Sequence, residues 1–214
     1  MTHKNIIAEI IVFSLIFIFL IIPPFFNPVI TDSSLLFNWN FPYRQAGLFI
    51  FCMVLYFLSR NLNEAADGKK GFFYPSMIAL SLMFFTAIII KIITKSPGNP
   101  KDMLPSGRLE WLFCVLTFLF SAVYEEIIYR FYFSDALKRL LVFAKINNER
   151  VLFLIAEGTG LLAFAFAHFY LGITAVINAA VAHVVLRFLY KKTNLIWNCV
   201  IIHFIYNIIS LILL

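Results

Sequence analysis

Charged residues are scarce in this sequence. Asp, Glu, Lys and Arg make up only 13% of its 214 residues, about half of their usual share, while 62% are hydrophobic and the mean hydropathy is +0.92. This composition excludes a soluble globular domain. Several apolar runs reach or approach the roughly 20 residues that cross a bilayer, so we expect the lipid bilayer to surround the chain.

Several sequence signatures are also missing. Cys52, Cys114 and Cys199 are isolated in apolar runs, without a C-x-x-C pair, which argues against a disulfide or zinc framework. The compact H-E-x-x-H metalloprotease motif and the G-x-S-x-G serine motif are both absent. The two halves show no paired helix breaks at matching positions, which disfavours a proton-coupled transporter.

The apolar runs predict an all-α protein, a polytopic integral membrane helical bundle of about seven transmembrane helices (six to eight fit the pattern). Proline-rich or polar loops separate the first four runs, and Ser134–Arg150 is expected to be an amphipathic segment at the membrane surface. The expected spans are Ile6–Ile22, Ala46–Leu58, Phe72–Ile93, Trp111–Phe133, two spans within Val151–Tyr190, and Leu195–Leu214.

The basic residues, in excess at a net charge of 17 − 11 = +6, indicate an orientation rather than a nucleic-acid partner, because they lie mostly between the apolar runs. A cytoplasmic N-terminus places ten of them on the cytoplasmic side and five on the other. The ten are Lys4, Arg60, Lys69, Lys70, Lys138, Arg139, Lys145, Arg150, Lys191 and Lys192; the five are Arg44, Lys91, Lys95, Lys101 and Arg108. We therefore expect a multi-pass protein of the bacterial inner (cell) membrane, with a cytoplasmic N-terminus.

Three charges interrupt the fourth apolar run. Glu125, Glu126 and Arg130 lie where an unpaired charge is costly, so their retention indicates a function. Glu126 and Arg130 are four residues apart, on one helix face, and can neutralise each other. Glu125 lies roughly 100° from Glu126 around the helix, and we expect its carboxylate to remain available for chemistry.

Other polar side chains lie in later apolar runs. His168 follows Phe164 by four residues, so the phenyl ring can support the imidazole, and His203 and Asn207 share one helix face. A carboxylate with an imidazole can activate water, while a second imidazole and a carboxamide can stabilise an oxyanion. These residues favour hydrolysis without a metal; Glu125, His168 and His203 as zinc ligands are the alternative.

Depth along the helices constrains the span boundaries. Glu125 lies roughly 12 Å from the end of its span near Phe133, at 1.5 Å per residue. A next span beginning at Val151 would place His168 roughly 26 Å deep, whereas a start at Gly158–Gly160 places it roughly 12 Å deep. We therefore expect a helix break at these glycines, with the seven residues before them shallow or re-entrant, and a second break at Leu171–Gly172.

The three motifs together carry a family resemblance. Glu-Glu-x-x-x-Arg from Glu125, Phe-x-x-x-His from Phe164 and His-x-x-x-Asn from His203, in this order on separate helices, resemble the CPBP (Abi) family of intramembrane endopeptidases. Its eukaryotic relatives are the type II CAAX prenyl proteases. The resemblance marks residues 110–214 as a catalytic core, and leaves residues 1–109 as spans of unassigned role within a single membrane domain, 1–214.

The resemblance implies a role for each motif residue. Glu125 and His168 would activate water, His203 and Asn207 would donate hydrogen bonds to the oxyanion, and Glu126 and Arg130 would support them. The implied substrate is a membrane-associated peptide or protein. This chain departs from the family in having Phe131 after the motif arginine, and His183 and Arg187 where small residues are common.

Two alternatives remain at this point besides the metal-free endopeptidase. The first is a zinc-dependent membrane peptidase on the same scaffold. The second is a non-catalytic membrane protein that serves bacteriocin immunity or export, as some relatives do. Retention of all four candidate catalytic side chains argues against the second.

Overall fold

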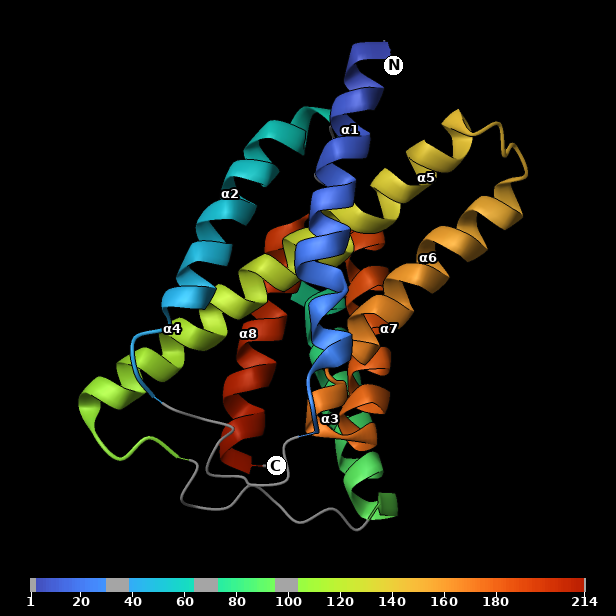
Figure 1. Cartoon of the computed structure of the whole chain (residues 1–214). Coiled ribbons are helices and arrows are strands. Elements are labelled where there is room, and N and C mark those ends of the chain that lie inside the picture. Colours follow the sequence, from blue (N-terminus) through green and yellow to red (C-terminus); the bar gives the residue numbers. More distant parts are fainter. Residues whose placement is uncertain (1–2, 30–38, 64–72, 95–103, 214) are drawn as a thin grey trace.

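The computed structural model describes residues 3–29, 39–63, 73–94 and 104–213, and the regular structure in these ranges is entirely helical. The π-helical segments are η1 and η5, and η2 and η6 are short 3₁₀ turns. In chain order the elements are α1 (His3–Ile16), η1 (Phe17–Ile21), η2 (Pro23–Phe26), α2 (Tyr43–Asn63), α3 (Phe73–Thr94), α4 (Arg108–Glu125), η5 (Glu126–Phe133), α5 (Ser134–Phe143), α6 (Glu149–Phe166), η6 (Phe169–Leu171), α7 (Ile173–Thr193) and α8 (Ile196–Leu213) (Figure 1).

The all-α membrane fold is confirmed. Because α4, η5 and α5 form one continuous helix, the described residues form seven helices, the expected number. Among the described residues, five helices are long and apolar enough to cross a membrane, and α2 contains a shorter apolar stretch, Tyr43–Ser59. Within the described ranges α6 is not among the five, because Glu149, Arg150 and Glu157 lie along it. The expected loops at 61–71 and 96–106, with Lys69, Lys70, Lys95 and Lys101, fall largely outside the described residues.

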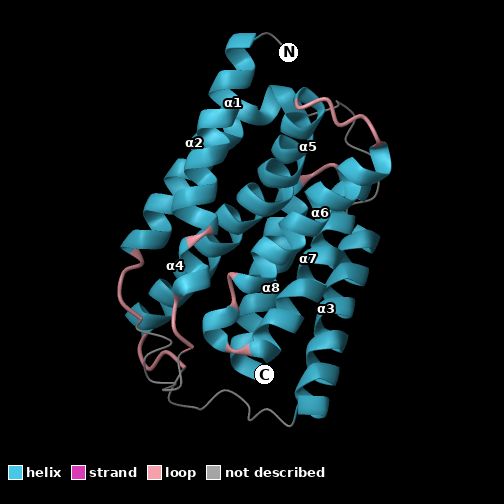
Figure 2. Cartoon of the chain, turned by 45° about the vertical axis from the view of Figure 1, so that its right-hand side comes forward, coloured by secondary structure: helices cyan, strands magenta, loops and turns pink. Residues whose placement is uncertain are grey.

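The long helix that carries the acidic motif runs through the centre of the bundle. All eight residues of η5 are buried, because α2, α6, α7 and α8 pack around this segment. Farther out, α7 packs between α3 and α6, and α3 also contacts α8 (Figure 2). The acidic motif is therefore enclosed by helices from both halves of the chain.

The structure corrects the expected boundaries around this helix. The helix does not end near Phe133 but continues through α5 to Phe143, and α5 and α6 then pack together as a helical hairpin (Figure 1). Ser134–Arg150 is therefore not a separate surface segment. The expected break at Gly158–Gly160 is wrong, because α6 is continuous from Glu149 to Phe166. The second expected break is confirmed by Gly172, whose φ of 91° ends the turn before α7.

Partly buried ion pairs connect the hairpin to the bundle. Arg187 of α7 pairs with both carboxylate oxygens of Glu157 at 2.9 Å and with Asp135 at 2.7 Å. Its third nitrogen donates to the backbone carbonyl of Arg130, within the π-helical segment. At the outer side of the hairpin Arg139 pairs with Glu9 of α1 at 2.6 Å. Arg187, a departure from the family pattern, thus joins α7 to α5, α6 and η5.

The two glycines of α6 should respond oppositely to alanine. A Cβ on Gly158 meets nothing within 4 Å, so Gly158→Ala should stabilise the helix by up to about 1 kcal/mol. A Cβ on Gly160 would lie 2.7 Å from the Ser134 hydroxyl, so Gly160→Ala should lower the unfolding temperature in detergent, at a cost of about 1–3 kcal/mol. Adding Ser134→Ala should recover much of the loss, and equal unfolding temperatures for the two single variants would contradict this packing.

Candidate active site

The two glutamates of the acidic motif lie at the junction of α4 and η5. Glu125 is the last residue of α4 and Glu126 the first of η5. Their environments differ, since the Glu126 side chain is fully buried whereas that of Glu125 is 13% exposed. The sequence predicts this division between a paired carboxylate and an accessible one.

Glu126 binds two partners rather than one. Its Oε1 lies 3.1 Å from the Nη1 of Arg130, which is also fully buried, and 2.7 Å from the Nδ1 of His203 on α8. The Arg130 guanidinium also lies 3.8 Å from the centroid of the Phe164 ring, a cation–π contact. Because a carboxylate paired with arginine only accepts hydrogen bonds, Nδ1 of His203 carries the proton.

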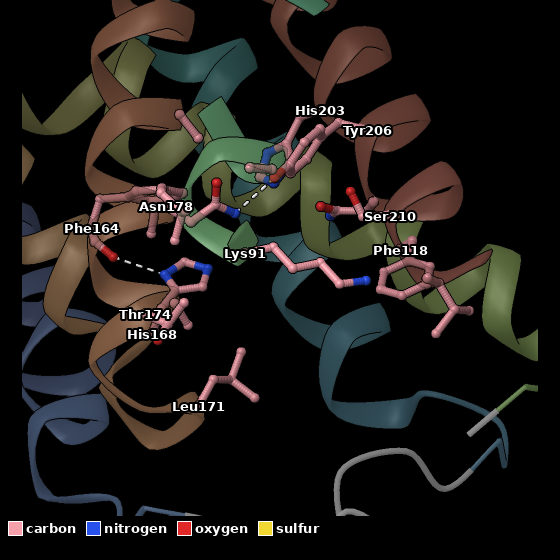
Figure 3. A pocket seen from close by; sticks show the side chains of 17 residues that line it. Lys91, Phe118, Phe164, His168, Leu171, Thr174, Asn178, His203, Tyr206 and Ser210 are labelled. Atoms are coloured by element: carbon pink, nitrogen blue, oxygen red, sulfur yellow. Dashed lines mark hydrogen bonds between the residues drawn. The ribbon is translucent and has the colours of Figure 1, made fainter. Parts of the chain in front are cut away.

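His168 is fixed by α6, although it lies just beyond the end of that helix. Its Nδ1 donates to the Phe164 carbonyl at 2.9 Å, and its ring packs on the Phe164 ring with centroids 4.8 Å apart (Figure 3). Phe164 is buried and also packs against His203, at 6.3 Å between centroids. The Phe164 ring thus orients both histidines and also contacts the guanidinium of the buried Arg130.

The remaining histidine nitrogens face the accessible glutamate. Glu125 Oε2 lies 4.0 Å from Nε2 of His168 and 3.9 Å from Nε2 of His203. Both separations are too long for a direct hydrogen bond, but each suits a water molecule shared by the two groups. The structure therefore brings three expected site residues, from α4, the end of α6 and α8, to one point.

A pocket of about 360 Å³ opens beside this point. Asn207, one turn after His203 on α8, also lines it, as do three residues of α3 that belong to the half of the chain without an expected role (Figure 3). The pocket is lined by Ala87, Ile90, Lys91, Phe118, Phe164, His168, Leu171, Thr174, Ala175, Asn178, Ala179, Ala182, His203, Tyr206, Asn207, Ser210 and Leu211.

His183 lies behind the site rather than in the pocket. Its side chain is buried and packs on Phe164, with ring centroids 5.5 Å apart. It is also close to the α6 backbone, since a Cβ on Gly160 would lie 3.8 Å from its Cε1. This position indicates packing behind the site rather than contact with substrate.

The distances from Glu125 to His168 and His203, the alternative zinc ligands, do not match those of a zinc site. A tetrahedral zinc ion with bonds of about 2.0–2.2 Å brings its ligand atoms to within about 3.5 Å of one another. The two distances from Glu125 to the histidines, 3.9 and 4.0 Å, are longer. Among the residues that the structure describes, no group of three His, Cys, Asp or Glu side chains is arranged to hold a metal ion.

Sequence reasoning missed the polar lining of the pocket. Asn178 donates a hydrogen bond to the Tyr206 hydroxyl at 2.7 Å, which joins α7 to α8 across the pocket wall. Tyr206 follows His203 by three residues and shares its helix face, so the helical spacing could have identified it. Lys91 fits a side chain that snorkels to the interface, and only the packing of α3 on α7 and α8 places it in the pocket.

Comparison with known proteins gives a family match for about half of the chain. Residues 107–209 match the family described as type II CAAX prenyl endopeptidase Rce1-like. Neither the curated proteins nor the solved structures give a match to the chain. The matched segment contains the acidic motif, both facing histidines and Asn207 in the order that the sequence resemblance requires. Residues 107–209 are therefore similar to the Rce1-like family of CAAX-protease-related membrane endopeptidases.

Proposed function

We propose that this protein is an intramembrane endopeptidase that hydrolyses a peptide bond of a membrane-associated protein or peptide without a resident metal. The observation that carries the proposal is the position of Glu125, whose Oε2 lies 3.9–4.0 Å from two imidazole nitrogens beside a pocket. A carboxylate and an imidazole around one water form a general-base site. The surrounding apolar helices give a membrane-bound substrate access to it.

Hydrolysis proceeds in two steps at this point. Glu125 takes a proton from water, His168 Nε2 accepts the water's other hydrogen bond, and the water oxygen bonds to the substrate carbonyl carbon. The carbonyl oxygen becomes an oxyanion that His203 and Asn207 stabilise by donating hydrogen bonds. The C–N bond then breaks, the proton on Glu125 passes to the leaving nitrogen, and a carboxyl end and an amine are released.

The second partner of each imidazole gives the two histidines different roles. Nδ1–H of His168 donates to a neutral carbonyl, so neutral His168 offers Nε2 as an acceptor. Nδ1–H of His203 donates to the Glu126 carboxylate, the ion partner that an imidazolium needs. Only imidazolium His203 carries Nε2–H, which an oxyanion donor requires. Glu126 is therefore a positioning residue that acts through His203.

The proposal extends to location and to the division of the chain. The proposed location is the bacterial inner membrane, and the count of basic residues favours a cytoplasmic N-terminus. Residues 110–214 supply the proposed chemistry. The spans before residue 110 contribute to substrate binding, because α3 lines the pocket through Ala87, Ile90 and Lys91.

Replacing Glu125 should abolish cleavage. The test is purified protein in proteoliposomes with a panel of membrane-tethered and lipidated peptides, followed by release of a quenched fluorophore. Glu125→Gln keeps the shape but removes the base, so the rate should fall about 10²- to 10⁴-fold. Glu110→Gln is the matched control, since Glu110 is at the other end of α4 and bonds Ser106.

Each outcome of this assay has a distinct meaning. Loss of cleavage in Glu125→Gln, with full cleavage by the wild type in a strong chelator, supports the metal-free mechanism. Loss with chelator that zinc restores would replace it with the zinc peptidase. Equal rates for Glu125→Gln and the wild type would exclude Glu125 as the base, and binding without cleavage across the panel would favour an immunity or export protein.

Glu126→Gln should slow turnover without weakening substrate binding. A carboxamide oxygen still accepts from His203 Nδ1–H but provides no charge for the imidazolium, so kcat should fall roughly 10- to 100-fold with KM little changed. Steady-state kinetics with the best peptide of the panel measure both constants. An increase in KM alone would show that Glu126 acts on substrate binding instead, and the unfolding temperature of the variant separates either effect from loss of fold.

A further inference from the structure

Arg187 on α7 binds the helix that carries the acidic motif, although it belongs to none of the three sequence motifs. Its side chain is only 6% exposed. Nε and Nη2 grip the two carboxylate oxygens of Glu157 at 2.9 Å each, and Nη2 also donates to Asp135 at 2.7 Å. Nη1 donates to the backbone carbonyl of Arg130. Two carboxylates therefore hold the guanidinium in one orientation, with its remaining nitrogen directed at the π-helical segment.

This contact is made at a sensitive point of the backbone. A π-helix is a rare conformation, and a buried backbone carbonyl needs a hydrogen-bond donor. Arg130 lies in the middle of η5, where all eight residues are buried, and its side chain pairs with Glu126 at the start of the same segment. A donor fixed on the Arg130 carbonyl therefore fixes the backbone from which the Arg130 guanidinium extends toward Glu126.

The same stretch of α7 is also joined to α8. The carbonyl of Leu186, the residue before Arg187, accepts a hydrogen bond from Sγ of the buried Cys199 at 3.4 Å. Cys199 and His203 are four residues apart on α8 and share one face of that helix. Adjacent residues of α7 thus contact η5 and α8, the two elements whose relative position sets the distance from Glu126 to His203.

We infer that Arg187 is a positioning residue that keeps the Glu126 carboxylate at 2.7 Å from Nδ1 of His203. It acts through the backbone and side chain of Arg130. Arg187 is not among the described residues that line the pocket, so its effect is on turnover rather than on substrate binding. The inference rests on the proposed function, in which His203 donates to the oxyanion. Its geometric part, the hold on the hydrogen bond between Glu126 and His203, is measured without any reaction.

Two variants of Arg187 and one matched control test the inference on the full-length protein. Arg187→Met removes every hydrogen bond of the guanidinium. Arg187→Lys keeps a cation beside Glu157, which protects the fold, but an ammonium group cannot grip Glu157 and also reach the Arg130 carbonyl. Lys191→Met is the control, since Lys191 lies one turn later on α7 and pairs with the same Glu157 carboxylate at 2.5 Å. It removes a cation from Glu157 and leaves the donor to Arg130 in place.

NMR follows the hydrogen bond itself. The chain has only four histidines, so isotope-labelled histidine in detergent micelles gives few imidazole signals, and His203→Gln assigns that of His203. The wild type and Lys191→Met should show a downfield, slowly exchanging Nδ1–H proton, because this proton is donated to a buried carboxylate. The signal should move upfield or be lost to water exchange in Arg187→Met, and Arg187→Lys should lie between.

An unchanged His203 signal in Arg187→Met would overturn the inference, as would the absence of this signal from the wild type. Unfolding temperatures show which variants are folded. If Arg187→Met does not fold, Arg187→Lys decides, and a wild-type signal in that variant would overturn the inference in the same way.

Kinetics separate a positioning role from a purely structural one. With peptides in proteoliposomes, Arg187→Met should lower kcat about tenfold or more with KM little changed, and Lys191→Met should match the wild type. In a Glu126→Gln background, where the charge for His203 is already gone, adding Arg187→Met should change kcat less than about twofold. A loss as large in that background as in the wild type would show that Arg187 acts by another route, and would overturn the inference.

The two measurements also separate failure of this inference from failure of the proposed function. A wild type that cuts no peptide, but whose His203 signal depends on Arg187, would refute the proposed function and leave the hold of Arg187 on His203 intact. A wild type that cuts peptides, with the same rate and the same His203 signal in the folded Arg187 variants, would do the opposite.

Discussion

A fully buried ion pair within one helix organises this molecule. Glu126 and Arg130 have no exposed side-chain surface, and such a pair is costly to bury and more costly to break. Each charged group also has a second contact. The Glu126 carboxylate binds His203, and the Arg130 guanidinium lies over the Phe164 ring. Phe164 in turn packs against His168 and His203, the two histidines of the candidate site. The pair therefore fixes the end of α6 and the middle of α8 in the positions that the proposed hydrolysis requires.

The backbone around this pair explains how a charged site is accommodated at the centre of the bundle. The motif helix widens into a π-helix over Glu126–Phe133, a form that often occurs at functional sites. Four neighbouring helices enclose that segment, so its polar backbone does not face lipid. Arg187 donates to the Arg130 carbonyl there and pairs with Glu157 and Asp135. A residue that departs from the family pattern thus stabilises the irregular segment from α7.

Much of this arrangement follows from the sequence, and the remainder depends on tertiary packing. Apolar run lengths predict the helices well, because crossing a bilayer imposes both length and composition. They do not show that α5 continues the motif helix, since the amphipathic pattern after Phe133 fits a surface segment equally well. That ambiguity led to the wrong break at Gly158–Gly160. The contact between His203 and Glu126, 77 residues apart, is likewise set by packing.

Two parts of the chain form the site. The matched segment holds every group that the proposed hydrolysis uses, while α3, from outside that segment, forms one wall of the pocket. The reacting groups must keep one geometry to within a fraction of an ångström, whereas the wall has only to fit a substrate. Substitutions in α3 can therefore change substrate preference without disturbing Glu125 and its histidines. By the same argument, the proposed reaction depends on the segment matched to the family, residues 107–209, and the proposed substrate preference depends also on α3.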